Sequence, residues 1–132
     1  MTEIIERGMD LAHINAELGR NAQGLVDWAV GLNKTAIVTT NFRPFEAVIL
    51  HMVTRANPHV PVVWMDNGYN TEATYRFADE VTKQLKLDLH IYLPRRSRAH
   101  REAVEGTTPA LDDPRHAAFT EEVKLEPFTR AL

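Results

Sequence analysis

The chain has 132 residues, 44% of them hydrophobic, which is enough for one compact domain and too few for two. Its 15 Lys and Arg and 18 Asp and Glu give a net charge of −3, which argues against nucleic acid or an anionic membrane as a partner. Cysteine is absent, so these residues supply no disulfide, no thiolate metal ligand and no cysteine nucleophile.

The N-terminal segment MTEIIERGMD contains acidic residues and no apolar stretch of signal-peptide length. No apolar run elsewhere reaches the roughly 20 residues that span a bilayer. We therefore expect a cytoplasmic protein with no membrane partner. The six histidines show no paired spacing, so a metal site is not expected. No cofactor is expected either.

The first predicted helix lies in AQGLVDWAVGLN, where apolar residues recur at helical spacing from Leu25 to Leu32. Gly31 and Asn33 are expected to end it. The next segment, TAIVTT, is short, β-branched and apolar, which predicts a strand buried on both faces.

Pro44 is suited to the first position of a second helix, and Glu46 to complementing the helix dipole. Asn57-Pro58 should end this helix. The apolar residues expected to line it are Val48, Ile49, Met52 and Val53.

VPVVWM reads as a second buried strand, DNGYN as a turn, residues 71–87 as an amphipathic helix, and LDLHIYL as a third strand. Strands that alternate with helices in this way predict a parallel sheet with its ligand at the C-terminal ends of the strands. The loops after Thr40 and Met65 should therefore lie together.

Beyond Pro94 the pattern weakens into a basic helical segment, RRSRAHREAVEG, then a loop and one or two short helices. The basic cluster consists of Arg95, Arg96, Arg98, His100 and Arg101. It could hold the phosphates of a nucleotide or another polyanion, but a charge run on a helix is more often a solvated face. Near the end, KLEPFTRAL contains Lys124, Glu126 and Arg130, which we interpret as structural.

Four blocks carry a family resemblance: LVDWAV, TTNFRPFEAVILHMV, the long segment from VPVVWMDNGYN to LHIY, and KLEPFTRAL. Over roughly residues 14–132 they resemble, in order and spacing, the N-terminal half of the sulfonucleotide reductases, which reduce phosphoadenylyl sulfate (PAPS) or adenylyl sulfate (APS) in assimilatory sulfate reduction. The resemblance implies an α/β fold of the adenine nucleotide alpha-hydrolase-like (PP-loop) type, with a parallel sheet and flanking helices, in one truncated domain over residues 1–132.

The resemblance also implies a nucleotide site at two strand-end loops. The implied nucleotide-binding residues are Thr39, Thr40, Asn41, Phe42, Arg43, Asp66, Asn67, Gly68 and Tyr69. Arg43 stands where the family has glycine, and Pro44 removes a donor N–H. Arg43 either binds the anion with its guanidinium group or closes the site. An Asn67-Gly68 hairpin turn is the alternative for the second loop, although a tight hairpin does not suit a strand-to-helix connection.

Family members attack the sulfate sulfur with a C-terminal cysteine, and thioredoxin or glutaredoxin resolves the product. Without a cysteine this chain has no catalytic residue for that step and is expected to be inactive alone. Thioredoxin becomes a partner only if a cysteine-bearing part exists. The alternative is a catalytically dead homologue that acts as a protein-interaction or regulatory module. An ATP-using PP-loop enzyme is disfavoured because no Ser-Gly-Gly-x-Asp-Ser-like stretch exists.

The absence of later strands should leave AIVTT as a long apolar edge of the sheet, which is a template for pairing. We predict that a homodimer partner, a separately encoded complementing chain, or the segment after Pro94 covers this edge. Hydrogen exchange then finds slow amides at Ile37 and Val38. A monodisperse monomer in which both amides exchange fast would contradict all three arrangements.

Overall fold

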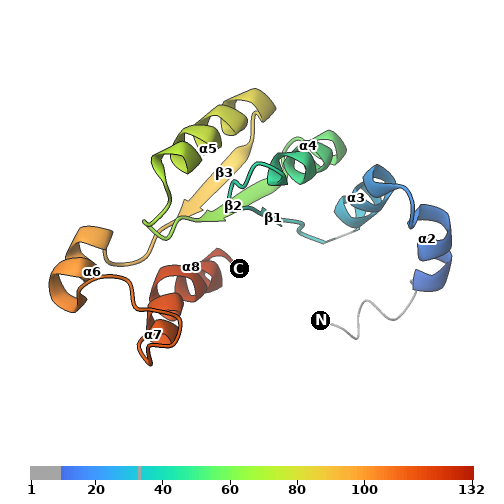
Figure 1. Cartoon of the computed structure of the whole chain (residues 1–132). Coiled ribbons are helices and arrows are strands. Elements are labelled where there is room, and N and C mark those ends of the chain that lie inside the picture. Colours follow the sequence, from blue (N-terminus) through green and yellow to red (C-terminus); the bar gives the residue numbers. More distant parts are fainter. Residues whose placement is uncertain (1–9, 33) are drawn as a thin grey trace.

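The computed structural model of the protein describes residues 10–32 and 34–132 (Figure 1). The elements in chain order are α2 (Leu11–Leu18), α3 (Ala22–Gly31), β1 (Val38–Thr39), α4 (Glu46–Ala56), β2 (Pro61–Met65), α5 (Glu72–Leu85), β3 (Asp88–Tyr92), α6 (Arg98–Glu105), α7 (His116–Thr120), the π-helical turn η1 (Glu121–Leu125) and α8 (Glu126–Ala131). The expectations for residues 1–9 and for Asn33 fall outside the described residues. Among the helices that are described, none combines the length and apolar character needed to cross a bilayer.

The three strands form one parallel sheet in the order β1-β2-β3. Val38 lies opposite Val62, and Trp64 lies opposite Ile91. Parallel neighbours need a crossover connection, which α4 and α5 provide. The predicted α/β class, with a parallel sheet and flanking helices, is confirmed.

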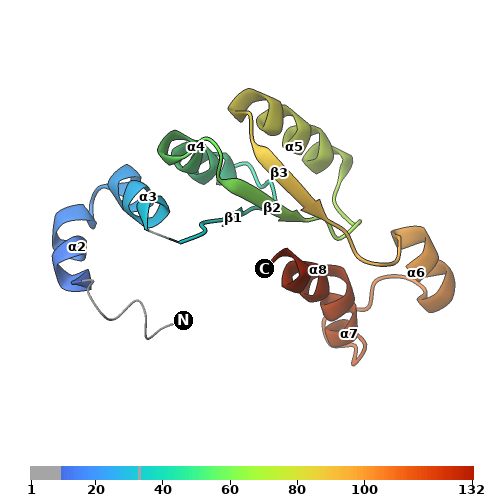
Figure 2. The ribbon, with the colours of Figure 1, turned by 180° about the vertical axis from the view of Figure 1, so that it is seen from behind.

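Helices α4 and α5 lie together over one face of the sheet (Figures 1 and 2). Their buried side chains, Leu50 from α4 and Ala78 and Val81 from α5, form one cluster with Val62 and Trp64 of β2. Val62 is fully buried. This cluster is the main core, because the central strand contributes to it beneath both helices.

The C-terminal helices gather on the other side of the sheet, where α8 contacts β2 and β3 (Figure 2). Val123 of η1 and Pro127 of α8 are buried there. The segment after β3 therefore folds back against β2 and β3, on the face opposite α4 and α5.

The amphipathic pattern predicted α5 closely. Thr71 caps its N-terminus by accepting a hydrogen bond from the Thr74 N–H at 3.2 Å, as Ser and Thr commonly do. Lys86 ends it in the left-handed conformation, with φ +52°.

The expectation that the first strand is buried on both faces is wrong. β1 has two residues; Thr39 is exposed and Ile37, just before the strand, is 36% exposed. In the described sheet β1 has β2 on one side and no strand on the other. An edge strand with one neighbour has less of its surface covered, so β-branched composition alone does not ensure burial.

The second helix begins two residues later than expected. Pro44 precedes the N-cap residue, Phe45, and Glu46 is the first helical residue. The buried residues of α4 are Leu50 and Val53. Of the four apolar residues that the sequence pattern selected, only Val53 is therefore buried, and the pattern missed Leu50. Val48 is 61% exposed, because the core cluster meets a different side of the helix.

The two valines of α4 provide a matched test of this core. Val53→Ala should lower the free energy of unfolding by about 2 kcal/mol, because a buried residue loses two methyl-sized groups. Val48→Ala should change it by less than about 0.5 kcal/mol, because the side chain is mostly in solvent. The measurement is urea unfolding with an unchanged slope. Equal shifts in the two variants would contradict this placement of α4.

Candidate functional site

The loop that follows β1 closes on the first residue of α4. Glu46 Oε2 accepts hydrogen bonds from the Thr40 hydroxyl at 2.8 Å and from the Asn41 N–H at 2.7 Å. The Arg43 N–H donates to the same oxygen at 3.3 Å. Backbone N–H groups that converge in this way form a concave anion site. The anion in it is the chain's own carboxylate.

Two opposing influences act on the pKa of Glu46. Burial is the largest single influence and raises the pKa. The hydrogen bonds from Thr40, Asn41 and Arg43, together with the positive charge of Arg43, outweigh burial and hold the pKa below its ordinary value. Glu46 is therefore ionised at neutral pH.

Phe42 belongs to the core. Its backbone is in the left-handed region, with φ +54°, and its side chain is 2% exposed. The ring packs edge-on against Trp64, with centroids 4.9 Å apart. Phe42 therefore offers no side chain to a ligand, and its N–H already donates to the Thr40 hydroxyl oxygen at 2.9 Å. The next residue, Arg43, is exposed.

The loop after β2 is fixed by the Asp66 carboxylate. Its Oδ1 atom accepts hydrogen bonds from the Gly68 N–H at 3.0 Å, the Asn70 amide at 3.0 Å and the Tyr75 hydroxyl at 2.8 Å. Burial and this hydrogen bond raise the pKa of Tyr75. Gly68 has φ +81°, a conformation that other residues rarely adopt. The loop connects a strand to a helix, so it is not a β-hairpin.

The last predicted site residue of the second loop, Tyr69, packs against α6 and α7. Its ring lies edge-on to Phe119, with centroids 5.5 Å apart. The Arg98 guanidinium lies 4.7 Å from the ring centroid, a cation–π contact. The Tyr69 hydroxyl is buried with no hydrogen-bond partner among the described residues.

The residues of the predicted site are divided between two clefts. The first cleft has a volume of about 310 Å³ and is lined by Thr39, Thr40, Asn41, Glu46, Met65, Lys124, Leu125 and Phe128. The second cleft has a volume of about 330 Å³ and is lined by Asp66, Asn67, Gly68, Leu93, Pro94, Arg96, Ser97 and Arg98. The structure thus brings Thr39, Thr40 and Asn41 together in one cleft, and Asp66, Asn67 and Gly68 together in another.

The sequence interpretation missed the far wall of the first cleft. Lys124 and Leu125 of η1 and Phe128 of α8 line it, although we interpreted KLEPFTRAL as purely structural. Local pattern could not place these residues, because their position depends on α8 folding back against β2 and β3. Lys124 therefore places a positive charge in the wall of the first cleft, which Thr40 and Asn41 also line.

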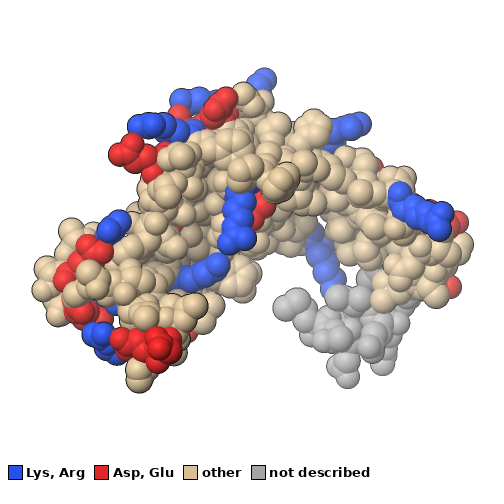
Figure 3. Space-filling model, viewed as in Figure 1, with Lys and Arg blue, Asp and Glu red and all other residues tan. Residues whose placement is uncertain are grey.

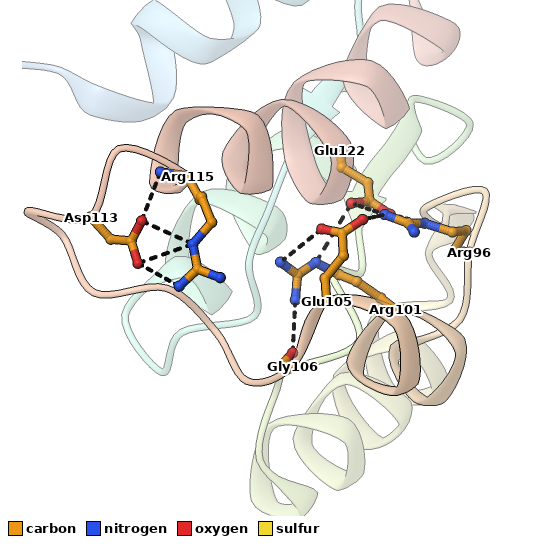
Figure 4. Close-up of polar contacts among 7 residues, drawn as sticks. All are labelled: Arg96, Arg101, Glu105, Gly106, Asp113, Arg115 and Glu122. Atoms are coloured by element: carbon orange, nitrogen blue, oxygen red, sulfur yellow. Dashed lines mark hydrogen bonds and ion pairs between the residues drawn. The ribbon is translucent and has the colours of Figure 1, made fainter.

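The basic cluster is largely neutralised within the chain (Figure 4). Arg96 binds both carboxylate oxygens of Glu122, at 2.6 and 2.8 Å, and also bonds to Glu105. Arg101 is 4% exposed and lies 3.5 Å from Glu122 and 3.7 Å from Glu105, with its guanidinium over the Phe119 ring. The expectation of a solvated face is therefore wrong for Arg101, because η1 packs against α6 and supplies Glu122.

The remaining arginines of the cluster are also paired. Arg95 bonds to Glu126 at 2.9 Å, and Arg98 to Glu102 at 2.9 Å. In the view of Figure 3, acidic and basic side chains are interspersed over α5 and over the α6–α7 end. This surface therefore has no extended field of one sign.

The chain is similar to known proteins over most of its length. Residues 35–132 match the family described as the phosphoadenosine phosphosulfate reductase domain. The chain is 36% identical to a phosphoadenosine 5'-phosphosulfate reductase of Synechococcus sp. over 127 residues, which cover 92% of this chain and 54% of that protein. It is 37% identical to the Escherichia coli O139:H28 protein of the same name over 130 residues, which cover 97% and 53%.

A solved structure is similar as well. The phosphoadenylyl-sulfate reductase of Candida auris, in a phosphate complex, superposes with a TM-score of 0.75 at 27% identity, covering 91% of this chain and 59% of that one. The chain belongs to the phosphoadenosine phosphosulfate reductase domain family, as its resemblance predicted. It spans about half the length of the curated relatives it matches.

The ion pairs of Glu122 predict a pH-dependent stability. The hydrogen bonds from Arg96, followed by its charge, hold the pKa of Glu122 below the ordinary value. A lowered pKa contributes stability that is present above the ordinary pKa and is lost as the pH falls through the folded-state value. Glu122→Gln should lower the free energy of unfolding by about 1–2 kcal/mol at neutral pH, since Arg101 loses a partner.

Glu121→Gln is the matched control, because Glu121 is the exposed neighbouring acid of the same turn. It should leave stability within about 0.5 kcal/mol of the wild type. Urea unfolding at neutral pH and below about pH 4 checks both expectations. A Glu122→Gln deficit that persists unchanged in acid would show that the ion pairs are not its cause.

Proposed function

We propose that this chain is the nucleotide-binding part of a PAPS reductase and that the first cleft takes an adenine sulfonucleotide, PAPS or APS. The observation that carries the proposal is the cleft itself, formed where β1 ends, with Thr39, Thr40 and Asn41 on one wall and Lys124 on the other. Parallel α/β sheets bind ligands at the C-terminal ends of their strands. Membership of the family supports a role in sulfate assimilation.

The lining of the first cleft suits an amphipathic anion. Lys124 offers a positive charge, and the Thr39 hydroxyl can donate a hydrogen bond to a phosphate or sulfate oxygen. Met65, Leu125 and Phe128 give apolar contact of the kind that an aromatic base requires. A purely polar anion would leave these three side chains without a partner.

The second loop lines the second cleft, and we propose that the ligand extends to it from the first. Asp66, Asn67, Gly68 and Tyr69 directly follow Met65, which lines the first cleft. We propose that their backbone borders the adenosine. The hydrogen bonds to Asp66 support this role, because a loop held in one conformation loses little entropy when a ligand binds.

The reduction itself requires a further group. In the family a cysteine thiolate attacks the sulfate sulfur, and these 132 residues contain no cysteine. The thiolate, and with it any exchange with thioredoxin, would come from outside these residues. We expect the chain by itself to bind nucleotide without reducing it.

A protein-interaction module is the second candidate. An apolar groove of about 330 Å³ runs beside β1 and is lined by Val26, Ala29, Val30, Ala36, Ile37, Val38, Ile49, Val53 and Val60. In the described sheet β1 has one edge without a neighbouring strand, and such an edge next to an apolar groove is suited to a homodimer partner or a complementing chain. A concentration-independent monomer in light scattering would exclude the homodimer and leave the complementing chain as the occupant.

Calorimetric titration with adenosine 3′,5′-bisphosphate, AMP and adenosine tests the nucleotide proposal. Lys124→Gln should weaken binding of AMP about tenfold and leave adenosine binding unchanged, because only the charged ligand loses an ion pair. Lys34→Gln, at an exposed lysine outside the clefts, should bind like the wild type. Equal weakening of AMP and adenosine would contradict the assigned role of Lys124, and absence of all binding would contradict the function.

A further inference from the structure

The Thr40–Arg43 loop is built to hold an anion and holds one already. Two backbone N–H groups and one hydroxyl converge on a single carboxylate oxygen, Glu46 Oε2. The Thr40 hydroxyl is fixed in turn, because its oxygen accepts the Phe42 N–H at 2.9 Å. Glu46 also begins α4, whose N-terminus favours negative charge. Every one of these features would serve a phosphate oxygen equally well.

The Glu46 carboxylate and the proposed ligand compete for the same hydrogen-bond donors. Thr40, Asn41 and Glu46 all line the first cleft, so two of the three residues that donate to Glu46 belong to its wall. A ligand oxygen cannot accept from these N–H groups while Glu46 Oε2 does. The carboxylate would also repel a phosphoryl or sulfuryl group held close to it.

We propose that Glu46 is an internal competitor for the anion-binding loop, so that a phosphoryl or sulfuryl group binds there only after this carboxylate leaves. The proposal rests on the proposed function where it names a nucleotide as the natural competitor. The competition itself applies to any tetrahedral oxyanion. Glu46 thereby sets both the affinity and the selectivity of the first cleft. Strong anions displace it, and neutral nucleosides leave it in place.

The other interpretation of Glu46 is purely structural. A glutamate that accepts from a backbone N–H three residues earlier resembles the second half of a helix capping box. In that role it would stabilise the loop and never exchange with a ligand. The two interpretations differ in what happens to anion binding when the charge is removed.

Titration with inorganic phosphate, followed by calorimetry, separates them. Glu46→Gln and Glu46→Ala should bind phosphate at least about tenfold more tightly than the wild type, because a charged competitor is gone. Glu72→Gln is the matched control, since Glu72 is also the acidic first residue of a helix and is exposed. Folded Glu46 variants that bind phosphate no better than the wild type would overturn the proposal.

A second measurement needs no variant. In the wild-type chain the carboxyl ¹³C resonance of Glu46 should move as AMP or phosphate saturates the cleft, while that of Glu72 stays in place. A Glu46 signal unmoved at saturation would overturn the proposal even if the substituted chains fail to fold.

Adenosine separates this inference from the proposed function. AMP and adenosine that bind equally well to the wild type and to Glu46→Gln would overturn the competition and leave the nucleotide site standing. Tighter phosphate binding by Glu46→Gln without any binding of adenosine or AMP would support the competition and remove the nucleotide function.

Discussion

Parallel pairing of β2 with both of its neighbours is the constraint on which the rest of the structure depends. It buries Val62 and Trp64 beneath α4 and α5, and it brings the ends of β1 and β2 to the same edge of the sheet. The two loops that leave this edge therefore emerge side by side. The proposed site residues lie in these two loops, and α8 adds Phe128 to the far wall of the first cleft.

The sequence predicted the elements whose pattern is local. Thr71 and the amphipathic pattern marked α5 to within about two residues, whereas the burial of β1 was wrong because composition does not reveal how many neighbours a strand has. Glu46 could be read as complementing a helix dipole, but its turn back toward Asn41 depends on the left-handed backbone of Phe42. The approach of Lys124 required a fold-level contact between distant segments.

Many charged side chains of the described residues are paired within the chain. Arg96 and Arg101 meet glutamates across the α6–η1 contact, and Glu46 meets the N–H groups of its own loop. Such pairs orient elements more than they stabilise them, because each charge loses hydration when it is covered. Lys124 differs, since it lies in a cleft wall and is exposed. Residues 95–101 contain four arginines, yet Figure 3 shows no broad cationic face. The glutamates that pair with these arginines are the reason.

The π-helical turn η1 controls the phase of the last helix. Its closing hydrogen bond runs from the Glu126 N–H to the Glu121 carbonyl, five residues back, so the turn holds one residue more than an α-helical turn. Each residue of an α-helix rotates the following side chains by about 100°. The extra residue lets Glu122 face α6 while Lys124 faces the cleft and Pro127 is buried. A one-residue deletion there would rotate α8 about its own axis and uncouple the cleft wall from the arginine pairs.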